Sequence, residues 1–335
     1  MQRKAQIKSW LLDELKLPEF ELQPASSDAS FRRYFRVFPM NDSPISGDDN
    51  TLIVMDAPPD KEDSGPFVKV ATIMADIGLN VPLIKHSNLE NGFLLLSDLG
   101  SKQYLSALNE TNVEHLYGDA LQALLTLQAK GPKNNELPPY DHALLMREME
   151  LFREWYLKTH LQLSLSAQEE QMLSRMFEQL AQSALAQPRV CVHRDYHSRN
   201  LMLTSANNPG ILDFQDAVIG PITYDLVSLL RDCYIAWPKQ QVESWALNYL
   251  KQAADQGVIE ERDETQLLQW FDWMGVQRHL KATGIFARLN HRDGKPGYLQ
   301  DIPRTLSYVV DVSGRYEQLQ PLNDFLRQRV DIVTG

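Results

Sequence analysis

Three polar side chains at fixed spacing stand among short apolar runs in the middle of the chain: Asp195, Asn200 and Asp213. Asp195 ends the tripeptide His193-Arg194-Asp195, and Asn200 follows it by five positions. A carboxylate can accept the proton of an alcohol that attacks the γ-phosphate of ATP, and an amide with a second carboxylate supplies the oxygen ligands that Mg²⁺ prefers. The spacing therefore predicts phosphoryl transfer, with Asp195 as base and with Asn200 and Asp213 as ligands of Mg²⁺.

Short β segments are expected to position these side chains. Apolar runs at 189–192, 201–203 and 211–212 predict three short strands, and Asn207-Asn208-Pro209-Gly210 predicts a turn between the last two. Strands of this kind would hold the polar side chains at one edge of a cleft.

Two other interpretations of this stretch stay open. His193, Asp195 and His197 alternate, so on a strand they would share one face and could bind a transition metal. The absence of a partner cluster of His or Cys elsewhere in the sequence argues against that metal site. The other interpretation is a loop of hydrogen-bonded polar residues without any chemistry.

Size and composition limit the class of protein. The chain has 335 residues, enough for one large or two moderate domains, and a formal net charge of -11. Nucleic acid is therefore not expected as a partner, because phosphate backbones require a basic surface. Cys191 and Cys233 lie in apolar surroundings and are expected to be buried, reduced thiols. Neither an apolar signal core nor a membrane span is found, which predicts a cytoplasmic protein with no membrane partner.

The first hundred residues carry mostly β patterns, and one helix is expected to pack against them. The expected elements are an amphipathic helix at 3–16, a hairpin at 20–37 with a small polar tip at 24–30, a polar loop at 41–50, a strand at 51–55, a helix at 66–77 capped by Gly78, and a strand pair at 81–84 and 93–96 around Asn91-Gly92.

The remainder of the chain has helical patterns around the central stretch. Thr111 with Glu114 and Ser166 with Glu169 each predict a capping box at a helix start. Further helices are expected at 144–156, 225–236, 242–253, 266–289 and 305–318. The predicted fold is α+β and two-lobed: a nucleotide-binding lobe at 1–100, a hinge near 96–100, a helical lobe at 101–335 with the catalytic loop and substrate site, and the nucleotide between the lobes.

Together with Gly220-Pro221 and Tyr224-Asp225-Leu226, these motifs resemble the aminoglycoside phosphotransferase and choline kinase superfamily, which has a protein-kinase-like fold. Five segments narrow the resemblance to the bacterial anomeric kinases of peptidoglycan recycling. They are residues 28–36 (DASFRRYFR), 55–59 (MDAPP), 94–100 (LLLSDLG), 277–281 (QRHLK) and 292–295 (RDGK). Those enzymes phosphorylate the C1 hydroxyl of N-acetylmuramate and N-acetylglucosamine.

The resemblance implies roles for further residues. The segment with Leu96, Asp98 and Leu99 would be the hinge that contacts adenine, with ATP and Mg²⁺ as cofactors. His193 would have a structural role, and Asp225 would brace the catalytic loop. Alternatively, Asp225 is an ordinary acidic residue in the first turn of a helix, where a negative charge is favourable.

The nucleotide-binding hairpin departs from the pattern of protein kinases. It has no glycine between Phe20 and Phe38, so Ser27 and Ser30 are taken as the small residues that let backbone N–H groups approach phosphate. The usual lysine of the third strand is also missing, because Met55 and Asp56 stand there. Its expected substitute is either Arg32 or Arg33, since neighbouring strand residues face opposite sides. The usual glutamate partner is not evident on the 66–77 helix, although Glu62 and Asp63 lie just before it.

The acceptor is predicted from a basic segment at 274–304, which reverses the overall negative charge. Such a segment suits an anionic or neutral polar substrate, and the expected contacts are Arg278, Arg292, Asp293 and Lys295, the last three in a loop. A solvated helix face is the alternative for each of them. Kinases for an aminoglycoside, choline or homoserine, a protein kinase and a non-catalytic nucleotide-binding regulator stay as alternative functions.

Overall fold

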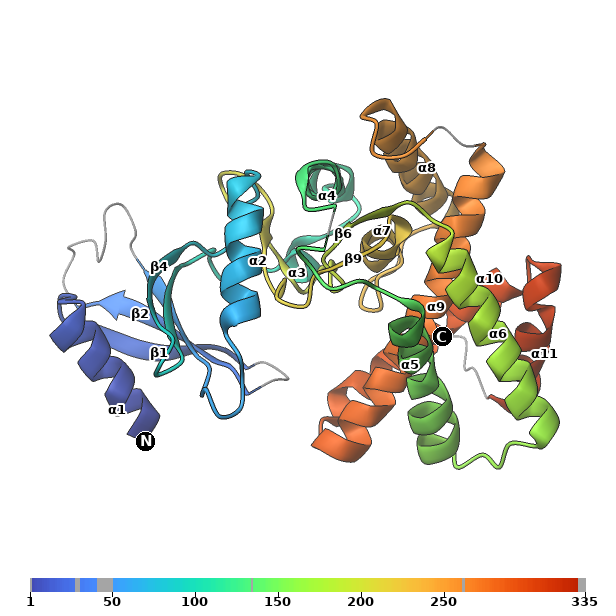
Figure 1. The fold of residues 1–335 in the computed structure, drawn as a ribbon, viewed down its shortest axis with the longest axis horizontal. Helices are drawn as coiled ribbons and strands as arrows, with labels where there is room; N and C mark the ends of the chain where they lie inside the picture. Colours follow the sequence, from blue (N-terminus) through green and yellow to red (C-terminus); the bar gives the residue numbers. More distant parts are fainter. Residues whose placement is uncertain (1, 28–30, 41–50, 134, 261–262, 331–335) are drawn as a thin grey trace. The chain divides into compact units, whose positions relative to one another are not determined.

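A computed structural model describes residues 2–27, 31–40, 51–133, 135–260 and 263–330 (Figure 1). The chain divides into two compact units, Met1–Gln103 with Leu201–Asp216, and Tyr104–Asn200 with Ala217–Gly335. The segment 201–216 follows the Asp195 loop in sequence, yet it packs in the first unit and not with the helical part of the chain.

The first unit is built on an antiparallel sheet of five strands in the order β1-β2-β3-β5-β4. The strands are β1 (Phe20–Ser27), β2 (Arg33–Pro39), β3 (Leu52–Asp56), β4 (Ile84–Asn88) and β5 (Phe93–Ser97). The hairpin, the third strand and the β5 strand are confirmed, but the predicted tip at 24–30 is wrong in its first part, because β1 stays paired with β2 as far as Ser27. The predicted strand at 81–84 is wrong: pairing starts at Ile84 and continues to Asn88, because Pro82 has no N–H to donate and the turn lies beyond Asn88. The predicted loop at 41–50 lies outside the described residues.

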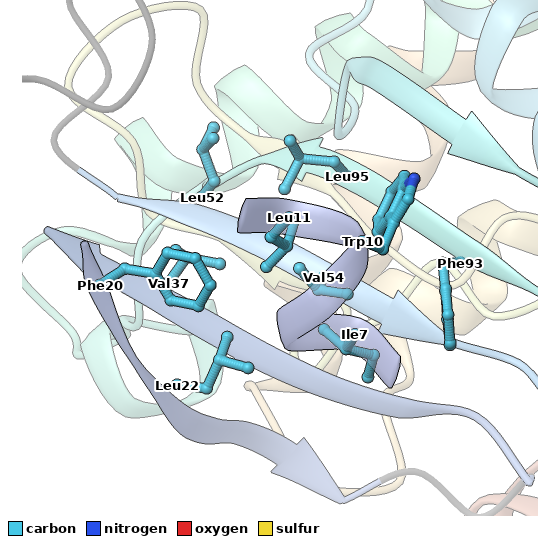
Figure 2. Close-up of a cluster of buried hydrophobic side chains, with 10 residues drawn as sticks. All are labelled: Ile7, Trp10, Leu11, Phe20, Leu22, Val37, Leu52, Val54, Phe93 and Leu95. Atoms are coloured by element: carbon cyan, nitrogen blue, oxygen red, sulfur yellow. The ribbon is translucent and has the colours of Figure 1, made fainter. Parts of the chain in front are cut away.

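An N-terminal helix covers one face of this sheet. It runs as α1 (Gln2–Ser9) and continues as a π-helical turn, Trp10–Glu14, which confirms the predicted helix at 3–16. Ile7, Trp10 and Leu11 lie at helical spacing and point onto the strands (Figure 2). They close a buried cluster with Phe20, Leu22, Val37, Leu52, Val54, Phe93 and Leu95. Each such side chain contributes about 1.5–3 kcal/mol when it leaves water, so the helix is part of the core.

A second helix of the first unit, α2 (Gly65–Asp76), confirms the predicted helix at 66–77. Phe67, Val70 and Met74 are buried on one stripe. Gly78 ends the helix with a left-handed φ of 88°, and the N–H of Leu79 bonds to the carbonyl of Met74 at 3.0 Å. Glycine adopts this conformation without steric cost, which explains why it follows the helix.

Asp56 at the end of β3 is fully buried and holds two arginines. Its Oδ1 accepts from Arg3 Nε at 3.0 Å, and its Oδ2 accepts from Arg33 at 2.5 Å. We expect Asp56→Ala to lower the free energy of unfolding by about 2–3 kcal/mol, because two cations lose a desolvated acceptor while remaining partly hydrated. Urea unfolding measures the change. Asp60→Ala, at an exposed carboxylate, serves as control, and an equal loss in both variants would contradict the expectation.

The second unit is mostly helical. Its helices are α3 (Tyr104–Ala107), α4 (Val113–Lys130), α5 (His142–Leu151), α6 (Ala167–Leu185), α7 (Thr223–Leu230), α8 (Lys239–Asp255), α9 (Glu264–Asp293), α10 (Ile302–Ser313) and α11 (Gln320–Arg329). The α5 helix continues as a π-helical stretch, Phe152–His160. The long α9 packs against α5, α6, α7, α8 and α10, and its middle is buried on nearly every side. Gly284 permits the closest approach, since a Cβ there would lie 2.3 Å from the backbone carbon of Leu151.

Of the two predicted capping boxes, one is confirmed and one is wrong. At the start of α6, Glu169 N–H donates to Ser166 Oγ, and Ser166 N–H donates to Glu169 Oε2 at 2.7 Å. At the start of α4, Thr111 instead donates its hydroxyl to Asn109 Oδ1 at 2.6 Å. The side chain of Asn109 forms a local turn there, and this turn removes the threonine from the capping position.

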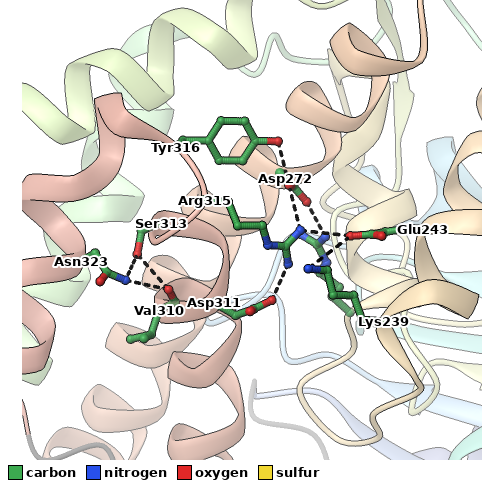
Figure 3. Close-up of polar contacts among 10 residues, drawn as sticks. Lys239, Glu243, Asp272, Val310, Asp311, Ser313, Arg315, Tyr316 and Asn323 are labelled. Atoms are coloured by element: carbon green, nitrogen blue, oxygen red, sulfur yellow. Dashed lines mark hydrogen bonds and ion pairs between the residues drawn. The ribbon is translucent and has the colours of Figure 1, made fainter.

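Polar contacts join α8 and α9 to the C-terminal end of α10 (Figure 3). Arg315 Nη1 lies 3.0 Å from Glu243 of α8 and 3.3 Å from Asp272 of α9, and its Nη2 donates to Asp311 of α10. Tyr316 also donates to Asp272 at 2.8 Å. The α10 helix therefore ends at Ser313, earlier than the predicted 318, because the next residues turn back to bind Asp272. Among the helices of the described residues, none has the length and apolar composition that a membrane crossing requires.

Candidate active site

The loop that carries Asp195 leaves a buried strand. That strand, β6 (Arg189–Val192), pairs with β9 (Val218–Pro221), and Cys191 is buried and in no disulfide, as is Cys233. Arg194 then takes a left-handed φ of 80°, which turns the chain, and the N–H of Asp195 donates to His193 Nδ1 at 3.2 Å. Residues 193–197 are therefore not a strand, so the alternating metal site that depended on one is not formed. In the described part of the chain, no three His, Cys, Asp or Glu side chains are grouped to hold a metal ion.

Two buried carboxylates brace this loop. Asp225 Oδ2 accepts from the N–H of His193 at 2.6 Å, and its Oδ1 accepts from the N–H of Arg194 at 2.9 Å. Asp232 Oδ2 accepts from the N–H of Ser198 at 2.9 Å. Asp225 lies on α7 and Asp232 just after it, seven positions on, so one segment holds both ends of the loop. Asp232 was not among the predicted residues; its spacing of two helical turns from Asp225 was the available signal.

Asp225 should make stability depend on pH. Burial raises its pKa to about 7, although the N–H bonds from His193 and Arg194 act to lower it. A carboxyl whose pKa is raised by folding binds its proton more tightly in the folded state, so its contribution to stability is lost as pH rises from about 4 to 7. We expect Asp225→Asn to remove this loss, on the order of a few kcal/mol. Urea unfolding at pH 5 and pH 8 tests it, and parallel pH profiles for the two proteins would contradict it.

Asp195 lies among positive charges of the second unit. Burial acts to raise its pKa, but Lys281, His197, Arg278 and Arg194 together hold the pKa of Asp195 below its ordinary value. The carboxylate is therefore ionised at neutral pH, which is the state that a proton acceptor needs.

The cations beside Asp195 are held by a carboxylate that the sequence did not single out. Glu148 of α5 is buried and accepts from Arg194 Nη2 at 2.5 Å, from Lys281 Nζ at 3.1 Å and from the hydroxyl of Tyr140. Burial opposes the ionised form of Glu148, yet Lys281 and Arg194 lower its pKa. Glu148 thus fixes the arginine of the His193-Arg194-Asp195 tripeptide. No local pattern marks it, because it lies 46 positions before Arg194.

Asn200 closes the loop back on Asp195. Its N–H donates to the carbonyl of His197 at 2.9 Å, and its Nδ2 donates to the backbone carbonyl of Asp195 at 3.0 Å. The amide oxygen, at the other end of the side-chain group, is the end that suits a hard cation. Asp195 and Asn200 are therefore held in one rigid turn of the second unit.

Asp213 belongs to the first unit. It follows a hairpin of two short strands, β7 (Leu201–Met202), one residue shorter than predicted, and β8 (Gly210–Ile211), one position earlier than predicted. Asp213 has a left-handed φ of 64°, a conformation that costs most residues about 1 kcal/mol, and its Oδ1 accepts from Gln215 Nε2 at 2.8 Å. The next residue, Phe214, is buried against Phe67 of α2 with ring centroids 4.9 Å apart. Phe214 thus anchors the turn that presents the carboxylate of Asp213.

The predicted arginines of the nucleotide hairpin have different partners. Arg33 is half exposed and pairs with Asp56 at 2.5 Å. Arg32 is only 8% exposed, and its Nη2 lies 3.4 Å from Glu62, just before α2. Of Ser27 only the backbone is described, which pairs with Arg33, and Ser30 lies outside the described residues.

The predicted hinge begins in the last residues of β5. Leu96 is buried and paired with Ile53 of β3, and the side chain of Leu99 lies against Gly210, where a Cβ would come within 2.9 Å. The carboxylate of Asp98 accepts from Arg36 Nε at 2.5 Å and from the N–H of Gly100 at 2.9 Å. The side chain of Asp98 therefore stabilises the turn. The backbone of this segment is the part suited to contact a base.

The predicted substrate residues are not gathered in one place. Arg278 is buried in the middle of α9, near Asp195, with its Nη1 3.8 Å from Cys233 Sγ. Arg292 and Asp293 form the last turn of α9, not a loop, and pair with each other at 2.7 Å. The loop prediction was wrong there because the helix continues to Gly294, whose φ of 64° ends it. Lys295 follows, with its N–H bonded to the carbonyl of Leu289 at 2.9 Å.

Comparison with known proteins decides the family. The family described as "Phosphotransferase enzyme family" matches residues 21–297. The chain belongs to this family. This phosphotransferase is 49% identical to the N-acetylmuramate/N-acetylglucosamine kinase of Pseudomonas aeruginosa, over 93% of this chain and 89% of the relative. It is 44% identical to the protein of the same name from Pseudomonas putida, over 97% of this chain and 96% of the relative.

A solved structure agrees on the fold. The ADP-bound aminoglycoside phosphotransferase APH(2'')-Ib matches this phosphotransferase with a TM-score of 0.60 at 15% identity, over 92% of this chain and 98% of that one. The predicted family, the α+β protein-kinase-like fold and the assignment as a kinase are confirmed. As a kinase, the protein uses a nucleotide as its phosphoryl donor.

Proposed function

We propose that this phosphotransferase transfers the γ-phosphoryl group of ATP to the anomeric hydroxyl of N-acetylmuramate and N-acetylglucosamine. The observation that carries the proposal is the identity of 42–49% with three kinases that bear these two sugars in their names, over at least 93% of this chain. An enzyme that consumes ATP and acts in peptidoglycan recycling would work in the cytoplasm, as predicted from the sequence.

In this proposal Asp195 is the catalytic base. The anomeric oxygen bonds to the γ-phosphorus, the bond from that phosphorus to the β–γ bridging oxygen breaks, and ADP leaves. The proton of the hydroxyl passes to the carboxylate of Asp195, which is kept ionised by Lys281 and Arg278. Asp225 and Glu148 hold the loop in place, so that catalysis depends on positioning and on stabilisation of charge.

The donor set of the motif fits Mg²⁺. Asn200 would offer its amide oxygen and Asp213 its carboxylate, and hard oxygen ligands of this kind are those that Mg²⁺ takes in proteins. When bound, Mg²⁺ neutralises charge on the phosphate oxygens. The left-handed backbone at Asp213 supports its role, because strained residues gather at functional sites.

For the nucleotide, we assign Arg32 in place of the missing lysine. Its ion pair with Glu62 supports this choice, since a lysine of this kind is normally held by a glutamate near the adjacent helix. Arg33 is less suited because its guanidinium is bound to Asp56. The backbone of 96–99 would contact adenine, and the hairpin tip with Ser27 and Ser30 would approach the phosphates.

An acceptor panel tests the function. ATP consumption is measured with N-acetylmuramate, N-acetylglucosamine, kanamycin, choline, homoserine and no acceptor, together with loss of the reducing end of each sugar. We expect turnover with the two N-acetyl sugars and an equal loss of reducing ends, because a phosphate on C1 blocks ring opening. The methyl glycoside of N-acetylglucosamine, whose C1 oxygen is blocked, is the control. Turnover of the methyl glycoside, or of choline or kanamycin alone, would refute the proposal.

A further inference from the structure

Arg199 is the second arginine of the loop that carries Asp195, and it lies directly before Asn200. Its guanidinium carbon stands 3.6 Å from the ring centroid of Tyr234 and 5.7 Å from that of Tyr298. Its side chain is 32% exposed. The guanidinium is thus held by its face against an aromatic ring, and its N–H donors point outward in the plane of the group.

These donors are not used by any described residue of the chain. Among the described residues Arg199 makes no hydrogen bond, and the nearest carboxylate oxygen, Asp301 Oδ2, is 3.9 Å from Nη2, beyond hydrogen-bond distance. The other arginine of the loop differs, because Arg194 donates to Glu148 at 2.5 Å. Stacking therefore orders Arg199 and leaves its hydrogen-bonding capacity for a ligand.

Asp301 is the complementary group. It precedes α10, is only 6% exposed, and its Oδ2 has no hydrogen-bond donor within the described part of the chain. A buried carboxylate oxygen without a donor is costly, so such groups in folded proteins mark bound water or a ligand. A group that donates to Asp301 and accepts from Arg199 would satisfy both, and a hydroxyl group does so.

Charge and shape indicate the class of ligand. Arg199 and Asp301 offset each other, so the pair favours neither a polycation nor a carboxylate. Beside them, the ring of Phe286 stacks on Tyr298 at 5.8 Å and 17° and lies 6.2 Å from Tyr234. Phe286 is buried, whereas Tyr234 and Tyr298 are partly exposed and offer apolar ring surface to the C–H face of a sugar. The chemistry fits a neutral pyranose with free hydroxyl groups.

This cluster adjoins the catalytic loop within the second unit. The ring of His197 stands edge-on to Tyr234 at 5.3 Å, and the N–H of His197 donates to the carbonyl of Asp195 at 3.0 Å. We propose that Arg199, Tyr234, Tyr298 and Asp301 form the acceptor subsite, which binds the hydroxyl groups and ring face of the sugar. The inference rests on the proposed function. It replaces the predicted substrate contacts at 292–295 with this subsite.

Arg199→Gln tests the acceptor subsite. We expect the KM for N-acetylglucosamine to rise about tenfold or more, as for loss of a hydrogen bond from a charged group, while the KM for ATP stays unchanged. Asp301→Asn should act in the same direction, and the double variant should fall short of the product of the two effects, since both contact one hydroxyl. Tyr298→Leu provides an independent change if Asp301→Asn folds poorly, which thermal unfolding detects. Arg329→Gln, at a surface arginine 37% exposed that pairs with Glu169, is the matched control.

Two comparisons separate the possible outcomes. N-acetylmuramate carries a carboxylate and N-acetylglucosamine does not, so equal rises in KM support recognition of neutral hydroxyl groups. A rise in the KM for N-acetylmuramate alone overturns the inference. So does a rise in the KM for the sugars in Arg292→Gln with no rise in Arg199→Gln. Saturation-transfer NMR measures sugar binding without turnover. Binding that is lost in Arg199→Gln supports the subsite even if the wild type transfers no phosphate, a result that would refute only the proposed function. If the wild type binds neither sugar, the subsite is refuted.

Discussion

Asp195→Asn is expected to lower kcat with N-acetylglucosamine by about 10²–10⁴-fold, with little change in the KM for ATP. The amide cannot take the proton of the attacking hydroxyl, and it also removes the negative charge that faces Lys281 and Arg278. The loop itself should keep its conformation, because it is held by the backbone bonds to Asp225 and Asp232, which the substitution leaves in place. Steady-state ATP consumption measures kcat, and far-UV circular dichroism shows whether the variant keeps its fold.

The control for this substitution is Asp324→Asn, the same chemical change at an exposed position of α11 in the same unit. It should leave kcat within about twofold of the wild type, as surface changes away from a site normally do. A folded Asp195→Asn protein with kcat near the wild-type value would exclude Asp195 as the base, and with it the proposed mechanism.

The local part of the site could be predicted from the sequence. The spacing of His193, Asp195 and Asn200 predicts a loop that follows a buried strand, whereas the bracing role of Asp225, about 30 positions further on, came from the family resemblance. Ser166 with Glu169 gave a capping box for the same reason: each feature depends on residues within a few positions of one another. The geometry of the local backbone fixes the spacing of residues in such features, so the spacing can be recognised in the sequence.

The rest of the site depends on contacts between distant segments. Glu148 reaches Arg194 across 46 positions, and Asp301 meets Arg199 across an even longer interval, so no periodicity connects them. The prediction for 292–295 failed for a related reason. Gly294, Pro296 and Gly297 suggested a loop, but α9 continues through the exposed residues Arg292 and Asp293 and ends only at Gly294, which is left-handed. Glycine here is the cap that ends a helix, although the same residue type also marks loops.

Asp213→Asn is the second large effect that we expect. Asn tolerates the left-handed φ of 64° as well as Asp does, so this substitution, unlike Asp213→Ala, changes the ligand charge without adding backbone strain. The loss of one anionic ligand should lower kcat about 100-fold or more, and it should shift the magnesium concentration for half-maximal rate upward. Magnesium titrations of ATP consumption at saturating sugar give both quantities.

Asp216→Asn is the matched control, because Asp216 is an exposed acid three positions beyond Asp213 in the same unit. Its magnesium titration should coincide with that of the wild type. If Asp213→Asn lowered kcat with an unchanged magnesium titration, the carboxylate would act on positioning alone, through its bond to Gln215, and Asn200 would need another partner for Mg²⁺. If instead both variants shifted the magnesium titration equally, the effect would reflect net charge near the bound nucleotide and not a metal ligand at position 213. Long-range charge acts almost equally from two acids so close in sequence, whereas direct coordination of Mg²⁺ acts from one of them alone.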